Sequence, residues 1–261
     1  MSLADRAVYP SQPGPLASEI DRLLRNAEAD VALAEGEIVA LIVPDSNRMS
    51  GGPVSAAAYR LLQGMRFDSV IIVSPSHDGD FGRLSVCRAD QYHTPLGTVA
   101  INDAIRNELC DEDDDIFLDD RGHFHTEGVD VQLPFLQRVL KEDFDVVPIV
   151  MGSEASALCR ELGHAIGEVM YGHRVLVIAS ADLLSVEGDA FERFEKALES
   201  FNTSELMHLL GSEQIRVEGM GAVVTAVLAA ERRRANRARV LRVEPPDGEQ
   251  VGALACVLWR A

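Results

Sequence analysis

Three predicted strands of this chain each lead into a residue that can bind a cation or move a proton. Asp45 follows Leu-Ile-Val-Pro, His77 follows Val-Ile-Ile-Val-Ser-Pro-Ser, and Asp182 follows Val-Leu-Val-Ile-Ala-Ser-Ala. The carboxyl ends of parallel strands meet at one edge of an open α/β sheet, where ligands bind. We therefore expect these three side chains to share a site for a metal ion or for acid–base chemistry.

Each of these residues also has a purely structural interpretation. An aspartate after a strand often only caps the next helix, which suits Asp182 because Leu183 and Leu184 follow it. That interpretation is weaker for Asp45, since the Ser-Asn-Arg after it is not a helix start. His77 could instead cap the Asp-Gly turn that follows it, but its strand-end companions favour a site.

A loop farther along the chain carries a second group of candidate ligands. His123 and His125 are separated by one residue, so they could converge on a metal ion, and Asp130 and Gln132 follow. We favour an exposed polar loop, because the acidic run at 111–115 lies just before it. That run lacks the alternating ligands and the mid-loop glycine of an EF-hand and is predicted to be solvated.

Glu218 stands directly before a glycine and an apolar predicted helix. A carboxylate at that place can stabilise the positive end of the helix dipole without any further role. The sequence holds no nucleophile elbow, no dinucleotide-binding glycine motif after a strand and no phosphate-binding loop. The candidate chemistry therefore rests on the strand-end residues.

Strand and helix patterns alternate along the chain and must position these residues. Apolar, β-branched runs predict strands at 37–43, 69–74, 145–151, 174–180, 238–244 and 251–259, and two short strands within 84–100. Other periodicities predict helices at 15–34, 53–65, 101–110, 130–140, 154–170, 189–200, 204–211 and 220–234. Strands separated by helices imply a three-layer α/β/α sandwich with a mainly parallel central sheet. We expect residues 1–261 to form a single domain, with a Pro-rich extended arm at 1–14.

Composition restricts the partners and the compartment. The 261 residues carry a formal net charge of −18, which would repel the phosphates of a nucleic acid. No apolar run reaches the roughly 20 residues of a membrane-spanning helix, and no secretory signal is visible. The four cysteines are scattered without a Cys-x-x-Cys pair, as expected for reduced thiols. We therefore expect a cytoplasmic protein that binds neither nucleic acid nor membrane.

Short motifs along the chain resemble, in the same order, those of the Memo family, which includes AmmeMemoRadiSam system protein B. Ser-Pro-Ser-His ending at His77 is similar to that family's Gly-Pro-Ser/Asn-His, and Ser-Ala-Asp ending at Asp182 to its Ser-Ser-Asp. The Thr-Pro-Leu turn at 94–96 and the segment Val-Gln-Leu-Pro-Phe-Leu at 131–136 also have counterparts. The resemblance implies a Memo-like fold akin to that of class III extradiol dioxygenases.

The resemblance breaks down at the residues of the family's metal site. The family pattern is His, His and Cys, and the corresponding residues here are Asp45, His77 and Glu218. The histidine of the family's Glu-His-Ser motif is replaced by Glu127. Carboxylates in place of Cys and His favour a harder cation. The resemblance therefore implies either a harder divalent-metal site, for Fe, Mn, Zn or Mg, or a site that has lost its metal.

On these grounds the chain is expected to be a divergent Memo-like protein of unproven activity, with a metal cleft formed by Asp45, His77 and Glu218. His77, Asp182 and Glu127 are the candidate catalytic residues, and the last two would orient ligands or relay protons. The alternatives are a non-heme metal-dependent dioxygenase or hydrolase, and a non-catalytic peptide- or protein-binding module. The expected partner is a small molecule or a protein, and the resemblance adds a radical-SAM protein.

Overall fold

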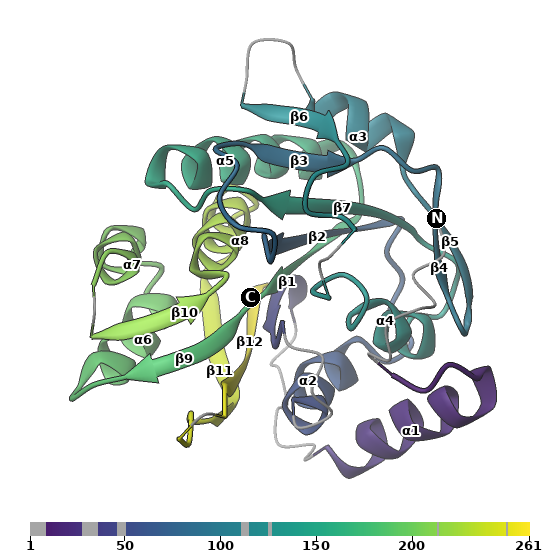
Figure 1. The fold of residues 1–261 in the computed structure, drawn as a ribbon, viewed down its shortest axis with the longest axis horizontal. Helices are drawn as coiled ribbons and strands as arrows, with labels where there is room; N and C mark the ends of the chain where they lie inside the picture. Colours follow the sequence, from purple (N-terminus) through teal and green to yellow (C-terminus); the bar gives the residue numbers. More distant parts are fainter. Residues whose placement is uncertain are drawn as a thin grey trace.

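Four parallel strands form the centre of a large mixed sheet in the computed structural model (Figure 1). The structure describes residues 9–27, 36–45, 51–110, 115–124, 127–212, 214–248 and 250–261. The central strands, in spatial order, are β1 (Glu37–Val43), β8 (Val175–Ser180), β2 (Ser69–Pro75) and β7 (Asp145–Met151). Almost every residue in them is buried, as expected for parallel strands covered on both faces.

Antiparallel strands extend this centre on both sides. Beyond β1 lie β12 (Gly252–Arg260), β11 (Arg237–Glu244), β9 (Asp182–Val186) and β10 (Ile215–Glu218), and beyond β7 lie β3 (Leu84–Cys87) and β6 (Ile116–Asp119). A separate hairpin is formed by β4 (Gln91–Thr94) and β5 (Gly97–Ala100). The predicted α/β class is confirmed; the parallel arrangement holds for the central strands, whereas most of the flanking pairs are antiparallel.

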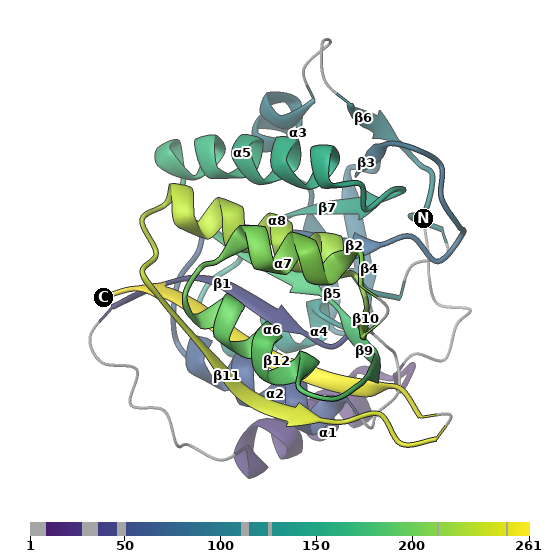
Figure 2. The ribbon, with the colours of Figure 1, turned by 90° about the vertical axis from the view of Figure 1, so that its left-hand side faces the viewer.

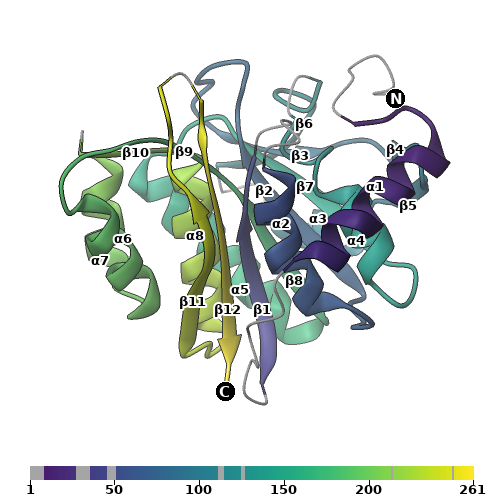
Figure 3. The ribbon, with the colours of Figure 1, turned by 90° about the horizontal axis from the view of Figure 1, so that it is seen from below.

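Helices cover both faces of the sheet and produce two apolar cores (Figures 2 and 3). The helices on one face are α3 (Asp103–Leu109), α5 (Ser156–Gly172), α6 (Ala190–Glu199), α7 (Thr203–Leu210) and α8 (Met220–Arg232). Those on the other face are α1 (Pro13–Asn26), α2 (Gly52–Tyr59) with its 3-10 turn η1 (Arg60–Leu62), and α4 (Leu133–Val139). None of the helices in the described ranges is long and apolar enough to cross a lipid bilayer.

Two local expectations from the sequence are wrong. Leu183 and Leu184 belong to β9, so Asp182 begins a strand and does not cap a helix. Pairing of β9 with β10 and β12 outweighs the helix propensity of the leucines. Helix α1 begins at Pro13, inside the expected arm, because proline suits the first turn of a helix. Residues 1–8 of that arm and residues 28–34 of the first predicted helix lie outside the described residues.

Candidate functional site

The central strands bring Asp45, His77 and Asp182 to the same edge of the sheet. β8 lies between β1 and β2 and is parallel to both, so the three strands end on the same side. β10 ends at Glu218, whose backbone pairs with Asp182 of β9. Four residues that are far apart in the sequence are thereby assembled at one place.

His77 and Asp45 make the closest side-chain contact of this site. Nε2 of His77 lies 2.7 Å from Oδ2 of Asp45 and 3.9 Å from Oε1 of Glu218. The hydrogen bond to Asp45 raises the pKa of His77 to about 9; burial opposes this rise, and the charges of Asp45, Glu218 and Glu127 add to it. The imidazole is therefore protonated at neutral pH and donates to the Asp45 carboxylate.

The Asp45 carboxylate is buried at the end of β1, where the residue is 1% exposed. Its backbone N–H donates to Oδ1 of Asp182 at 3.0 Å. Gly128 packs so closely that a Cβ there would lie 2.3 Å from Oδ1 of Asp45. That oxygen has no hydrogen-bond partner within the described parts of the chain. An unsatisfied buried carboxylate oxygen costs free energy, and binding a cation would remove that cost.

Glu154 is a member of the site that the sequence reasoning missed. Its side chain packs against the start of α8, where a Cβ on Gly221 would lie 2.9 Å from both Cβ and Cγ of Glu154, and the backbone N–H groups of Gly219 and Gly221 favour the ionised carboxylate. Burial raises the pKa of Glu154 to about 7, and the charges of Glu218 and Asp45 add to the rise. Glu154, which follows the fourth parallel strand, thus occupies the position at the α8 dipole that the sequence suggested for Glu218. The strand-end rule, applied to that strand as well, would have found it.

Glu218 and Glu127 complete the acidic surroundings of His77. Burial raises the pKa of Glu218, while the charge of His77 opposes that rise. The Glu218 side chain remains 39% exposed, against 24% for the His77 side chain. We call the whole set the acidic cluster; it has one histidine and five carboxyl groups, and its members are Asp45, His77, Glu127, Glu154, Asp182 and Glu218.

His123 does not join the acidic cluster, and the expected exposed loop is wrong for this residue. His123 is 5% exposed, and its Nε2–H donates to the carbonyl oxygen of Ser85 at 3.1 Å. Burial lowers the pKa of His123 to about 4, so the ring is neutral. His125 and residues 111–114 of the acidic run lie outside the described residues, so convergence of the two histidines stays a prediction.

Gln132 holds the strand ends that carry the acidic cluster. Its Nε2 donates to the carbonyl oxygen of Pro44 at 2.8 Å and to Oγ of Ser180 at 3.0 Å. Its Oε1 accepts a hydrogen bond from the Tyr59 hydroxyl at 2.8 Å. The side chain is fully buried, so one amide ties together β1, β8 and α2.

We expect Gln132→Met to destabilise the fold by about 2 kcal/mol, because it leaves several buried polar groups without partners. The free energy of unfolding from urea titration measures the effect. Gln63→Met, which changes an exposed glutamine in the same way, serves as the control. Equal stability of the two variants would contradict the role given to Gln132.

The donor chemistry of the acidic cluster suits a hard or borderline divalent cation, since two carboxylates and an imidazole can bind Mn, Fe(II), Mg or Zn. Within the described residues, however, no three His, Cys, Asp or Glu side chains already stand in a metal-binding arrangement. An ion shared by His77, Asp45 and Glu218 would have to displace the proton on Nε2. The exposed Glu218 side chain would also have to turn toward the ion.

The fold and the acidic cluster define an α/β protein with a polar site at the carboxyl ends of its parallel strands. The family model described as Memo-like protein matches residues 2–249. A MEMO1 family protein of Saccharolobus islandicus is 30% identical over 202 residues, which cover 73% of this chain and 70% of the relative. A MEMO1 family protein of Sulfolobus acidocaldarius is 29% identical over 205 residues, with the same coverage. The chain belongs to the Memo family, which confirms the resemblance seen in the sequence.

A solved structure shares the fold. The crystal structure of an uncharacterized protein from Escherichia coli K12 matches with a TM-score of 0.55 and 13% sequence identity. The match covers 84% of this chain and 99% of that protein. At this identity the likeness concerns the fold alone.

Proposed function

We propose that this Memo-family chain binds one divalent cation at the acidic cluster, with His77, Asp45 and Glu218 as its ligands. The observation that carries the proposal is Oδ1 of Asp45, a buried carboxylate oxygen with no hydrogen-bond partner in the described residues. The excess of carboxyl groups over the single histidine adds to it, because like charges in a partly buried place repel and a cation relieves that repulsion.

The remaining members of the acidic cluster would position the ligands. Asp182 accepts the backbone N–H of Asp45 and so fixes the end of β1. Glu127 lies close enough to influence His77 and is the group proposed to relay protons. When bound, a divalent cation supplies Lewis acidity and lowers the pKa of a water molecule on it.

We also propose that a metal ion bound at the acidic cluster would support catalysis. The ligand set supports a metal-dependent dioxygenase or a hydrolase, and assays with catechols after anaerobic Fe(II) loading and with ester substrates after Mn(II) or Zn(II) loading distinguish the two. A non-catalytic module for peptides or proteins is less well supported, because the excess of carboxyl groups would repel an acidic peptide. The small-molecule and radical-SAM protein partners stay predictions.

We expect the chelated and dialysed protein to take up about one equivalent of Mn(II), Fe(II) or Zn(II). In His77→Ala and Glu218→Gln the affinity should fall at least ~100-fold, because each variant removes a ligand. Metal analysis after desalting measures the stoichiometry, and titration calorimetry measures the affinity. His164→Ala, which removes an exposed histidine of α5, is the matched control. Failure of all three metals to bind, or unchanged affinity in His77→Ala, would overturn the proposal.

A further inference from the structure

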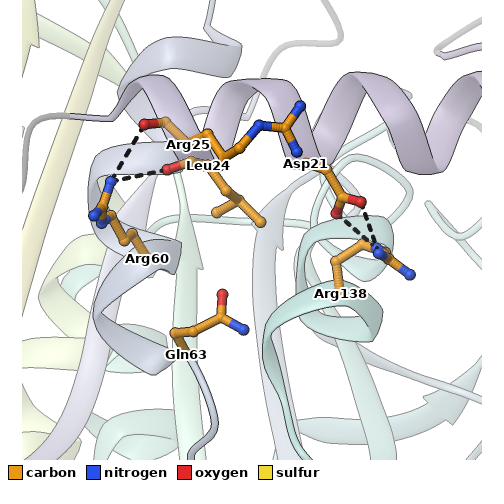
Figure 4. Close-up of a pocket in the computed structure, with 6 residues that line it drawn as sticks. All are labelled: Asp21, Leu24, Arg25, Arg60, Gln63 and Arg138. Atoms are coloured by element: carbon orange, nitrogen blue, oxygen red, sulfur yellow. Dashed lines mark hydrogen bonds and ion pairs between the residues drawn. The ribbon is translucent and has the colours of Figure 1, made fainter.

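A cavity of about 560 Å³ lies between α1, α4 and the turn that follows α2 (Figure 4). Helix α2 returns the chain from the end of β1 toward the start of β2, so this cavity is near the opposite edge of the sheet from the acidic cluster. Its lining contains three arginines and a single carboxylate, although the chain has a net charge of −18. The lining residues are Asp21, Leu24, Arg25, Arg60, Gln63 and Arg138.

Two of the arginines are held in place by the protein itself. Nη1 of Arg60 donates to the carbonyl oxygens of Leu24 at 3.2 Å and Ala27 at 2.7 Å, where α1 ends. Nε and Nη2 of Arg138 form a two-pronged contact with the Asp21 carboxylate at 2.9 and 2.8 Å. Each guanidinium has five N–H groups, so each keeps donors that these contacts do not use.

Arg25 is the arginine that the protein leaves uncompensated. Its carbonyl oxygen accepts a hydrogen bond from Nη1 of Arg60 at 3.5 Å, but its exposed guanidinium makes no hydrogen bond or ion pair with any residue that the structure describes. In Figure 4 it lies on the α1 side of the cavity, while Gln63 extends from the opposite side. Because Arg138 neutralises Asp21, the charges of Arg25 and Arg60 remain for a ligand.

We propose that this cavity binds a phosphorylated small molecule. Guanidinium groups present paired N–H donors that match the oxygens of a phosphate group, and arginine outperforms lysine in this role. Arg60 and Arg138 are already held by other residues, so less conformational entropy is lost when a ligand binds them, and this favours affinity. The volume lies within the range of small-molecule sites. Among the lining residues that the structure describes, all except Leu24 have polar or charged side chains, which suits a ligand with hydroxyl groups beside its phosphate, such as a sugar phosphate.

Titration calorimetry in about 150 mM NaCl, where the Debye length is roughly 8 Å, tests this site with ribose 5-phosphate, ribose and inorganic phosphate. We expect ribose 5-phosphate to bind more tightly than inorganic phosphate, and ribose not to bind. Arg25→Gln should weaken binding of ribose 5-phosphate at least ~10-fold, since it removes a charge-assisted donor. Arg160→Gln, which removes an exposed arginine of α5, should bind as the wild type does.

Unchanged binding in Arg25→Gln would overturn the assignment. Binding that appears only at low salt would do the same, because it would reflect diffuse attraction instead of a site. Equal affinity for inorganic phosphate and ribose 5-phosphate would show that the sugar makes no contribution to binding, and would contradict a site for a sugar phosphate. Binding of ribose 5-phosphate to His77→Ala at wild-type affinity is also expected, which separates this site from the metal proposed at the acidic cluster.

Discussion

Gly219→Ala is expected to destabilise the protein by about 4 kcal/mol and to disturb the acidic cluster. Gly219 has a φ of +81°, a left-handed conformation that costs alanine about 1–2 kcal/mol. A Cβ there would also lie 2.3 Å from the carbonyl oxygen of Ser180 and 3.1 Å from Cα of Ala181. Both atoms belong to the backbone, so no side-chain rotation relieves the overlap. The strand end that carries Glu218 must move or the fold must loosen.

The control for this substitution is Gly64→Ala. Gly64 has a similar φ of +76°, but a Cβ there would meet nothing within 4 Å. Gly64→Ala should therefore lower the free energy of unfolding only by the cost of placing alanine in a left-handed conformation, about 1 kcal/mol. Chemical denaturation of both variants gives the difference, and metal titration of Gly219→Ala reports on the position of Glu218. Equal losses of stability in the two variants would show that the close approach to Ser180 is unimportant.

Acidification from pH 7 to pH 4 is expected to remove about 3 kcal/mol of stability through His123 alone. Its Nδ1 is buried and has no partner among the described residues, so the folded protein resists protonation there. The pKa of His123 is lowered to about 4 in the folded state, against about 6.5 in the unfolded chain. Between these values the unfolded chain binds more protons than the folded one. The contribution of His123 is therefore complete above pH 6.5 and is lost as the pH falls through 4.

His123→Gln isolates this contribution, because glutamine does not titrate. The free energy of unfolding should fall less steeply with acidification in His123→Gln than in the wild type, and His164→Gln should follow the wild type. Urea titrations at several pH values between 4 and 7 provide the comparison. If wild type and His123→Gln lose stability in parallel, the buried neutral state of His123 is incorrect.

The parallel centre of the sheet could be predicted because its strands are apolar over their whole length. The runs at 37–43, 69–74 and 145–151 contain many β-branched residues, and such runs are buried on both faces whatever their neighbours. Strands β6, β9 and β10 have only four or five residues, and at least half of the residues in each are not fully buried. Their conformation depends on pairing with segments that are distant in the sequence, and local sequence patterns do not predict that pairing.

For the site, the strand-end residues could be predicted from the sequence, whereas the contacts between their side chains could not. The rule on strand ends placed Asp45, His77 and Asp182 at one edge, because parallel neighbours need no further information to bring their ends together. It did not give the contact between His77 and Asp45, which depends on the rotamers of both side chains. Only two residues separate Glu154 from β7, and it was missed because the rule was applied to three of the four parallel strands. Its role also depends on where α8 begins. The burial of His123 depends on its contact with Ser85, a residue of a distant strand.

The place of β12 in the sheet has a consequence for how the protein folds. This strand lies between β1 and β9, with Arg260 opposite Glu37. One edge of β1, the first strand in the sequence, therefore stays unpaired until β12, the last strand, has docked. Until then β1 presents an apolar edge. Pairings so far apart in the chain slow folding, and an open edge of this kind can recruit other chains. During folding, pairing of β12 with β1 therefore competes with aggregation through the unpaired edge of β1.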